Sequence, residues 1–330
     1  MRVLHISRTM GQGGAEKVVL GLAQLLVDQG DKAVVASCGG IHEQDLQRMH
    51  VHHYRIDDIE KKTPMTIAKT MVMLNHIVRN EKIEVVHSHH RMAALYARLL
   101  KVINPELKLI YTAHNVFFDK KILTKAALSE STIVAVGDSV KKNLVSVFGV
   151  NSNRIIRIYN GVKPEEVANV FCSKIVSWKQ EGDIIVGLIG RLTAQKGVDT
   201  FIHALSFVRG KVSNIRGIII GEGEEREYLK NLIREKKLEE YLFMAGYQEN
   251  ISAWIRQMDF VVMPSRWEGF PLLPLEVFTE GKTMIASDIE GIGETIKNGE
   301  TGILIPPDNI EKWASAIMKL ALSEDLREQL

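Results

Sequence analysis

The sequence predicts an α/β protein with two Rossmann-like halves in series, each built on a parallel sheet. Short runs rich in Val and Ile alternate with helical patterns along the whole chain, and the alternation lapses once, near the middle. Strands of a parallel sheet read as continuous apolar runs because helices cover both of its faces. A length of 330 residues also favours two domains over one.

Six strands are expected in the first half, namely RVLHIS (2–7), KAVVAS (32–37), VVHS (85–88), LIYTAH (109–114), TIVAVG (132–137) and RIIRIY (154–159). Helices are expected between them at 14–29, 65–80, 92–103 and 138–148. In the first of these helices Val18, Leu22 and Leu25 recur at helical spacing, and Gly30 ends the pattern.

Residues 160–182 show no strong period, so we interpret them as the connection between domains 1–165 and 166–330. The alternation then restarts with the strands DIIVGLIG (183–190), IRGIIIG (215–221), YLFMAG (241–246), DFVVMPS (259–265), TMIASD (283–288) and TGILIP (301–306). Helices are expected near 196–209, 224–237, 250–257, 271–281, 290–297 and 309–322. In such sheets ligands bind beyond the carboxyl ends of the strands.

Composition narrows the class of protein. Two cysteines, Cys38 and Cys172, argue against a disulfide framework and fit a reducing, cytoplasmic compartment. The first residues, MRVLHISR, are too short an apolar run for a signal peptide, and no stretch approaches the roughly 18 apolar residues of a membrane-spanning helix. Residues 1–165 carry 23 Lys and Arg against 15 Asp and Glu, a net +8, while the remainder carries 19 against 25, or −6. A basic first half hints at an anionic surface or substrate, although ordinary solvated surface explains it equally well.

The stretch MGQGGAEKVVL (10–20) places glycines between a strand and a helix, as phosphate-binding loops do. A nicotinamide-binding fingerprint would close with Gly or Ala, whereas Glu16 stands there. The next strand ends in Ser37, Cys38 and two glycines, with no acid for a ribose. The oxidoreductase interpretation therefore fails twice, and we expect Gly13 and Gly14 to serve another ligand.

The second half has two loops whose side chains could bind or act on a ligand. GRLTAQKG (190–197) sets Arg191 and Lys196 at the head of a helix, which suits a diphosphate, although a solvated basic turn is an equal alternative. In SRWEGFPLLPLEVF seven residues separate Glu268 from Glu276. Gly269 permits a sharp turn, and a helix is expected to start near Pro271. Its early backbone N–H groups, those of Phe270, Leu272 and Leu273, are candidate phosphate donors.

GGAE (13–16), NG (160–161), GRLTAQKG (190–197), GEG (221–223) and PSRWEGFPLLPLE (264–276) stand in the order of one family. From residue 2 to about residue 322 the chain resembles the retaining glycosyltransferases of family 4. The resemblance implies the GT-B fold, in which two Rossmann-like domains face a central cleft. The first domain would bind the acceptor and the second the nucleotide-sugar donor.

The resemblance also implies roles for individual residues. Arg191 and Lys196 match the cations that neutralise the donor diphosphate, with help from backbone amides near Phe270, Leu272 and Leu273. Glu276 matches the residue that binds the ribose. Glu268 and His114 match residues that contact the donor sugar, and Gly13 and Gly14 match the loop beside the diphosphate. Gly221, Gly246 and Gly269 are further donor-binding candidates, and the base pocket is expected at 242–246.

The family implies transfer of a hexose from a nucleotide-diphosphate sugar, most often a UDP-sugar, to a hydroxyl of a glycan or lipid-linked acceptor. The anomeric configuration would be retained by front-face attack, with no protein nucleophile, metal or other cofactor. Such enzymes serve polysaccharide or glycolipid synthesis.

The sequence departs from the family pattern in two places. EGIGE (290–294) has Glu290 and Gly293 where Gly and Pro are commoner, and the chain ends at SEDLREQL without the family's crossover helix.

Histidines and paired acids raise the possibility of a metal site. Alternation along a strand places His87 and His89 on one face, and His90 follows. No carboxylate or cysteine completes a ligand set there, so we favour a polar strand end and predict no metal. Asp57 and Asp58 lack strand context on both sides and are interpreted as loop acids.

FFDKKILTKAAL (117–128) mixes aromatic and aliphatic residues with Lys120, Lys121 and Lys125. This composition suits peripheral contact with an anionic membrane, and it also suits a helix that packs its apolar face on the domain. We therefore hypothesise a lipid-linked acceptor at the inner face of the cytoplasmic membrane, and no nucleic-acid partner. Two other functions stay open: a sugar-nucleotide epimerase of the same fold, and a non-catalytic protein that only binds the nucleotide sugar.

Overall fold

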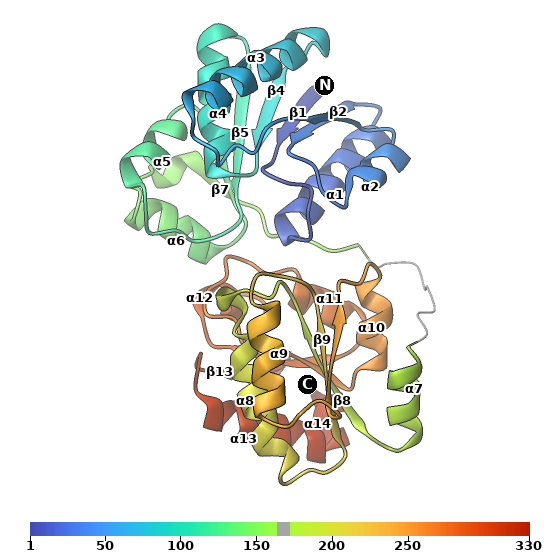
Figure 1. Cartoon of the computed structure of the whole chain (residues 1–330). Helices are drawn as coiled ribbons and strands as arrows, with labels where there is room; N and C mark the ends of the chain where they lie inside the picture. The colour runs from blue at the N-terminus through green and yellow to red at the C-terminus, as the bar shows by residue number, and fades with distance from the viewer. Residues whose placement is uncertain (164–171) are drawn as a thin grey trace. The chain divides into compact units, whose positions relative to one another are not determined.

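The computed structural model describes residues 1–163 and 172–330. The chain divides into two compact units, Met1–Asn160 and Gly161–Leu330, each with its own sheet (Figure 1). The boundary expected between residues 165 and 166 lies outside the described residues, as does Pro164.

The first domain contains a seven-stranded parallel sheet with the order β3-β2-β1-β4-β5-β6-β7. Its strands are β1 (Arg2–Ile6), β2 (Lys32–Ser37), β3 (His52–Arg55), β4 (Val85–Ser88), β5 (Lys108–Ala113), β6 (Thr132–Ala135) and β7 (Ile155–Arg157). The direction in which strands are added reverses between β1 and β4. That point is where open α/β sheets bind ligands.

Helices cover both faces of the first sheet, as the continuous apolar strands require. On one face α1 (Gly14–Asp28) and α2 (Glu43–Arg48) pack over β2 through Val19, Ala23 and Leu46. On the other, α3 (Pro64–Asn80) and α4 (Arg91–Ile103) pack on β1, β2 and β4 through Leu74, Ile77 and Tyr96. The remaining helices of this domain are α5 (Lys121–Ala127) and α6 (Asp138–Ser146).

The second domain contains a six-stranded parallel sheet with the order β10-β9-β8-β11-β12-β13. Its strands are β8 (Ile184–Ile189), β9 (Ile215–Ile220), β10 (Leu242–Gly246), β11 (Phe260–Met263), β12 (Thr283–Ser287) and β13 (Ile303–Ile305). Here the order reverses between β8 and β11. The loops that follow these two strands therefore meet at one edge of the sheet.

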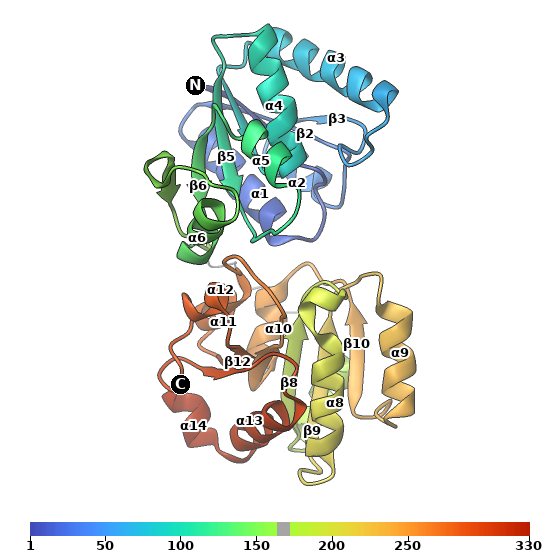
Figure 2. The same ribbon diagram turned by 90° about the vertical axis from the view of Figure 1, so that its left-hand side faces the viewer.

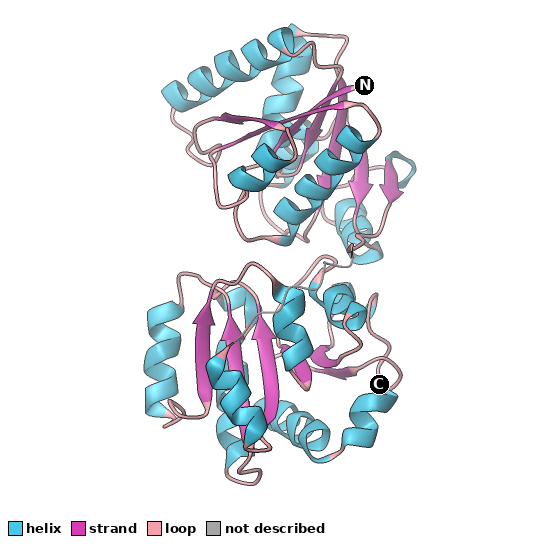
Figure 3. Ribbon diagram, turned by 90° about the vertical axis from the view of Figure 1, so that its right-hand side faces the viewer, coloured by secondary structure: helices cyan, strands magenta, loops and turns pink. Residues whose placement is uncertain are grey.

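One face of the second sheet carries α8 (Val198–Arg209), α9 (Arg226–Glu235) and α13 (Ile310–Leu322), which share a core that includes Phe201 and Trp313 (Figure 2). The other carries α7 (Ser173–Gln180), α10 (Ile251–Gln257), α11 (Leu273–Thr279) and α12 (Glu290–Gly293). Figure 3 shows the strands of each sheet enclosed by helices.

The predicted α/β architecture with two Rossmann-like domains is confirmed, but several elements were missed. The stretch 160–182 is not irregular throughout, because α7 lies within it and buries Ile175 and Trp178 against the second sheet. The polar edge strand β3 and the short helices α2 and α14 (Glu324–Gln329) were also not expected. α14 lies within SEDLREQL, and the partly buried Leu326 of this helix and Leu330, its C-cap, pack against the core of the second domain.

Candidate functional site

The loops that follow β8 and β11 are locked together. Gly197 has φ +61°, and a Cβ there would lie 2.1 Å from the backbone oxygen of Pro264. Gln195 donates its side-chain N–H to the Trp267 carbonyl at 2.7 Å, and the Arg266 backbone N–H donates to the Gln195 carbonyl at 2.8 Å. The predicted loop 190–197 and the predicted Glu268 turn are therefore parts of one structure.

Arg266, which was not predicted as a site residue, holds these loops together through its guanidinium. Its guanidinium bonds the Asp199 carboxylate at 2.8 Å, at the start of α8, and lies 2.9 Å from Asp308. It also donates to the Ala194 carbonyl. Three loops thus depend on one side chain, and only the order of the strands in the sheet brings them together.

Lys196 and Glu268 form an ion pair, with Nζ 2.6 Å from Oε1. The Glu268 residue is only 9% exposed, so its carboxylate has little access to water. The sequence placed Lys196 on a diphosphate and Glu268 beside a sugar, and the structure shows them in direct contact. Each side chain therefore fixes the position of the other.

Arg191 differs sharply from Lys196. It is exposed, and within residues 1–163 and 172–330 its guanidinium has no hydrogen-bond or ion-pair partner. An unpaired guanidinium presents a fork of N–H donors that matches phosphate geometry. The loop therefore offers one available cation and one cation held by a buried carboxylate.

The helix expected from Pro271 begins two residues later, at Leu273, with Leu272 as its N-cap. Leu272 and Leu273 thus lie at the N-terminus of the helix, where backbone N–H groups lack acceptors within the helix. Phe270 and Leu273 bury their side chains, while Glu276 is half-buried on the first turn. Gly269 lies where the chain turns from the Glu268 loop toward this helix.

Several glycines are needed because backbone approaches backbone. A Cβ on Gly221 would lie 1.9 Å from the Gly190 oxygen, so the loop after β9 rests on the loop after β8. Gly246 has φ +71°, and its carbonyl accepts from the Gly221 N–H at 2.8 Å. Close backbone contact explains Gly221 and the positive φ explains Gly246, while their predicted contact with a nucleotide stays a prediction.

Gly291 supports the Glu268 turn. A Cβ at this position would lie 2.5 Å from the Glu268 oxygen and 2.3 Å from the Gly269 oxygen. A Cβ on Gly293 would meet nothing within 4 Å. The departure from the family pattern at Gly293 thus falls where the space is open, and the glycine in close contact, Gly291, is present.

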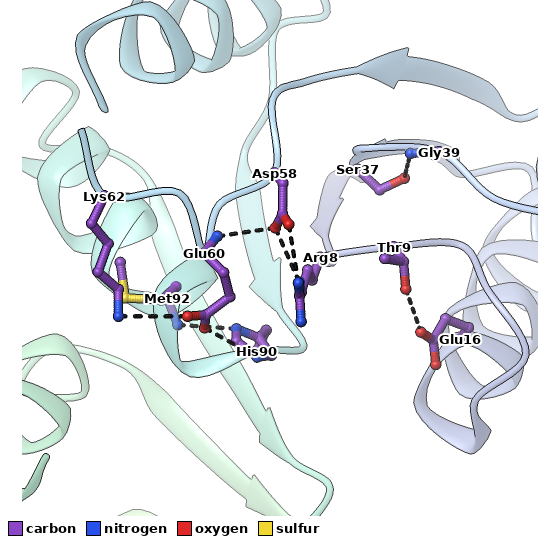
Figure 4. A network of polar contacts seen from close by, with 10 residues as sticks. All are labelled: Arg8, Thr9, Glu16, Ser37, Gly39, Asp58, Glu60, Lys62, His90 and Met92. Atoms are coloured by element: carbon purple, nitrogen blue, oxygen red, sulfur yellow. Dashed lines mark hydrogen bonds and ion pairs between the residues drawn. The ribbon is translucent and has the colours of Figure 1, made fainter. Parts of the chain in front are cut away.

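In the first domain the glycine loop follows β1 at the reversal of strand order. Glu16 folds back over Gly13, the N-cap of α1, and accepts a hydrogen bond from the Thr9 hydroxyl at 2.7 Å (Figure 4). A carboxylate at a helix N-terminus interacts favourably with the helix dipole and opposes an anion there. The α1 terminus is therefore already supplied with negative charge.

Four histidines gather at the carboxyl edge of the first sheet. His5 lies on β1, His87 on β4, and His89 and His114 directly follow β4 and β5. Burial lowers the pKa of His5 and of His114 to about 3 and that of His87 to about 4, and it places the pKa of His89 well below its ordinary value. All four rings are therefore neutral near pH 7.

The predicted histidine grouping needs correction. One nitrogen each from His5, His87 and His89 lies within 4.8 Å of the others, so the third ring near the strand pair comes from β1. His90 instead caps α4 by accepting from the Met92 N–H at 3.3 Å. Sequence spacing could not reveal His5, because its closeness depends on β1 and β4 being neighbours.

The acidic pair also has a structural context that was not expected, since β3 ends at Arg55, just before Asp57 and Asp58. Asp58 accepts two hydrogen bonds from Arg8, both of 3.0 Å, and these lower the pKa of its carboxyl (Figure 4). Glu60 lies 3.7 Å from His90 in the same network. This ion-pair network joins the ends of β1, β3 and β4.

The segment 117–128 has one buried face and one exposed face. Thr124, Ala127 and Leu128 are buried, so α5 packs one face on the domain. Phe118 is 72% exposed and Ile122 is 88% exposed, and lysines 120, 121 and 125 are exposed around them. Arg91 anchors the preceding turn, with its guanidinium 3.9 Å from the Phe117 ring and 2.8 Å from Asp119.

Two family models match the chain. The Glycosyltransferase Family 4 model covers residues 12–166, and the Glycosyl transferases group 1 model covers residues 173–330. The chain belongs to this glycosyltransferase family. The locked loops after β8 and β11 are thus a feature of the group 1 domain of a glycosyltransferase, and the histidine cluster belongs to its family 4 domain.

Characterised and uncharacterised relatives resemble this glycosyltransferase along most of its length. An uncharacterised glycosyltransferase of Methanocaldococcus jannaschii is 25% identical over 96% of this chain and 87% of its own. The UDP-Gal:alpha-D-GlcNAc-diphosphoundecaprenol alpha-1,3-galactosyltransferase of Escherichia coli is 25% identical over 76% of this chain and 70% of its own.

Solved structures show the same fold. HepE of Anabaena, in complex with UDP-glucose, matches with a TM-score of 0.83 at 18% identity, covering 100% of this chain and 93% of that one. WaaG, a glycosyltransferase involved in lipopolysaccharide biosynthesis, matches with a TM-score of 0.79 at 15% identity, over 99% and 92% of the two chains. These likenesses establish the GT-B fold for this glycosyltransferase.

Across the described residues, none of the helices is both long enough and apolar enough to pass through a lipid bilayer.

Proposed function

We propose that this glycosyltransferase moves a hexose from a nucleotide-diphosphate sugar, with UDP as the favoured nucleotide, to a hydroxyl of a glycan or lipid-linked acceptor. The observation that supports this most strongly is the interlocked pair of loops at the reversal of the second sheet. It holds Arg191, Lys196 and Glu268 at one sheet edge, where two cations suit a diphosphate. HepE, a relative in fold, binds UDP-glucose.

The proposed chemistry depends on stabilising a leaving group. Breaking the bond between sugar and diphosphate places negative charge on the phosphate oxygens, and fixed cations lower the energy of that transition state. Arg191 offers a guanidinium whose N–H donors have no partner in the described residues, and the ion pair with Glu268 fixes the position of the Lys196 ammonium. Glu276 is proposed to accept hydrogen bonds from the ribose, and the amides of Phe270, Leu272 and Leu273 to assist at the phosphates.

Donor binding would require Lys196 to share its charge. In the described protein the ammonium bonds the buried Glu268 carboxylate at 2.6 Å. An ammonium has three donor hydrogens, so Lys196 can keep this bond and still donate to a phosphate oxygen. Glu268 would then act by positioning Lys196, in addition to its proposed place near the donor sugar.

The first domain is proposed to contribute His114 to the sugar, and Gly13 and Gly14 to the side of the diphosphate. Glu16 covers the α1 terminus with negative charge, so the phosphate charge would be met from the second domain. We propose retention of configuration, with no metal and no covalent protein intermediate.

Transfer is tested by incubating the protein with UDP-, GDP- and ADP-sugars and with glycan or polyprenyl-diphosphate acceptors. Mass spectrometry should detect a glycosylated acceptor, NMR should show that the donor's anomeric configuration is kept, and EDTA should leave the rate unchanged. An altered sugar nucleotide formed without an acceptor would identify an epimerase. Donor binding with no product from any acceptor would favour a non-catalytic role.

We also propose that segment 117–128 contacts an anionic membrane surface, which would bring a lipid-linked acceptor within reach. Phe118 and Ile122 expose large apolar side chains among three lysines, while the other face of α5 is buried. Peripheral proteins bind bilayers by combining apolar insertion with attraction to anionic headgroups.

Vesicle sedimentation tests the membrane contact. The protein should bind vesicles containing phosphatidylserine or phosphatidylglycerol more strongly than neutral vesicles, and Ile122→Ser should weaken that binding. Val72→Ser, which alters another largely exposed apolar residue, on α3, is the matched control and should change nothing. Equal binding to both kinds of vesicle, or none to either, would reject the proposal.

A further inference from the structure

Three of the four clustered histidines are joined in a chain of hydrogen bonds. His5 Nδ1 lies 3.1 Å from His89 Nε2, and His89 Nδ1 lies 3.1 Å from His114 Nε2. The rings come from β1, from the end of β4 and from the end of β5, which are neighbours in the sheet. His87 stands beside this chain and is bonded instead to the Thr112 hydroxyl, at 2.8 Å.

We propose that His5 and His89 are positioning residues that hold His114 as the neutral tautomer with its proton on Nδ1. This inference rests on the proposed function for its effect on transfer, because it concerns the histidine assigned to the donor sugar. The tautomer itself is a property of the first domain alone.

The argument begins with the protonation state. Burial depresses the pKa of all three rings, so each is neutral at pH 7 and carries one N–H and one bare nitrogen. Each of the two hydrogen bonds needs one donor and one acceptor. His89 uses both of its nitrogens, so both bonds must run in the same direction along the chain of rings. The proton position on His5 therefore fixes the one on His114.

The free nitrogen of His5 decides that direction. His5 Nε2 is buried and has no hydrogen-bond partner in the described part of the chain. If the bonds ran from His114 toward His5, this nitrogen would carry a buried N–H with nothing to accept it, which is rare in native proteins. If they run from His5 toward His114, it carries only a lone pair. The second arrangement places a proton on Nδ1 of His5, His89 and His114.

The consequence concerns what His114 can do. Its Nε2 accepts from His89, so its Nδ1–H is the group left to donate. A fixed donor suits a hydroxyl or a developing negative charge on a ligand, and a group that donates cannot also serve as a general base through that nitrogen. This chain of hydrogen bonds from His5 through His89 to His114, called the relay below, thus makes His114 a hydrogen-bond donor.

A metal ion is the competing explanation for a histidine cluster. The facing nitrogens are 3.1 Å apart, which is within the range of a hydrogen bond. In the described residues the cluster of ligand-type side chains contains histidines only, without a carboxylate or thiolate. A hydrogen-bonded relay accounts for the paired nitrogens without an added ion.

The test uses nitrogen-15 NMR of the full-length protein near pH 7, which distinguishes Nδ1–H from Nε2–H rings directly. His114 should be the Nδ1–H tautomer in the wild-type protein and in His5→Asn, because the Asn side-chain NH2 can replace the His5 Nδ1–H donor. It should lose this tautomer in His5→Leu. His87→Gln, a change at a neighbouring buried ring outside the relay, is the control and should leave His114 unaltered.

Turnover of a nucleotide sugar gives the second readout. The relay predicts that His5→Asn keeps several-fold more activity than His5→Leu. A purely packing role predicts the reverse order, because Leu fills more of the buried space. An Nε2–H tautomer at His114, or a bound transition metal whose removal changes the ring nitrogen signals, would overturn the relay. If the wild-type protein transfers no sugar, the proposed function fails, while the NMR result still decides the relay.

Discussion

At the scale of single residues, the two cations of the loop after β8 differ in how they are held. Arg191 has no partner in the described residues, whereas Lys196 shares an ion pair with the buried Glu268. Replacing Arg191 should therefore leave the fold stable. Replacing Lys196 should not, since removing one partner of the pair leaves the Glu268 carboxylate buried and unpaired.

Arg191→Ala is expected to lower turnover about 100-fold or more, because it removes a donor aimed at charge that develops on the leaving group. The melting temperature should not change, since the exposed side chain makes no hydrogen bond or ion pair within the described residues. Turnover of a nucleotide sugar and thermal unfolding check the two parts. Arg234→Ala, an exposed arginine on α9, is the control and should keep full activity. Undiminished turnover in Arg191→Ala would contradict the assignment.

Lys196→Ala should lower turnover by a similar factor and should also lower the free energy of unfolding, by about 1–3 kcal/mol. The cause is the Glu268 carboxylate, which is buried and would lose its partner at 2.6 Å. The double variant Lys196→Ala/Glu268→Ala should recover part of the lost stability and none of the activity. Denaturant unfolding measures the first quantity. Equal stability of Arg191→Ala and Lys196→Ala would argue that the ion pair contributes little.

At the scale of helices and loops, glycine positions carry the site. Gly291→Ala should destabilise the second domain and reduce turnover, because the added Cβ would come within 2.5 Å of two backbone oxygens of the Glu268 turn. Gly293→Ala, on the same short helix, should be nearly neutral, since its Cβ would meet nothing within 4 Å. Unfolding and turnover of the two variants test this, and similar losses in both would show that α12, and not the close contact, is responsible.

The histidine cluster of the first sheet predicts that stability depends on pH. Their pKa values in the folded protein lie below the ordinary 6.5, at about 3 for His5 and His114 and about 4 for His87. As the pH falls below 6.5 the unfolded chain takes up protons that the folded chain does not, so stability falls. The slope is about 1.4 kcal/mol per pH unit for each such histidine.

Hydrogen exchange between pH 7 and pH 5 should therefore show β1, β4 and β5 losing protection before β8 and β11, after correction for the intrinsic exchange rate. Ten of the 11 histidines lie in the first half of the chain, which localises the effect. His87→Gln should reduce the slope by one histidine's share. Equal loss of protection in both sheets would contradict the prediction.

Most elements were predictable because their signals are local. Periods of apolar residues place α1, α3 and α4, and continuous Val and Ile runs place β8, β9 and β11. β3 escaped because HHYR lies at the sheet edge, where half its residues face water, and α7 because only two of its residues are buried. The Lys196–Glu268 pair, the contacts of Arg266 and the place of His5 depend on which strands are neighbours, and spacing along the chain carries no record of that order.

At the scale of the whole molecule, a net charge of +2 is the sum of two unlike domains. Residues 1–160 carry 22 Lys and Arg against 14 Asp and Glu, or +8, and residues 161–330 carry 20 against 26, or −6. The acidic domain is the one proposed to bind the anionic donor. General attraction by net charge therefore does not explain donor binding, and local groups such as Arg191 and the loop amides must supply it.

Ligand binding should accordingly stabilise the protein in a way that depends on those groups. A ligand that binds only the folded state stabilises it by about 2.7 kcal/mol at 100 times its Kd, which for a domain of this size raises the melting temperature by several degrees. UDP and UDP-sugars should produce such a shift in the wild-type protein, and Arg191→Ala should reduce it although its unliganded stability is unchanged. GDP and ADP compare nucleotides, and NADH is the control for a nicotinamide site, which the side chain of Glu16 and the missing ribose acid argue against. A shift with NADH and none with any nucleoside diphosphate would refute the proposed donor site.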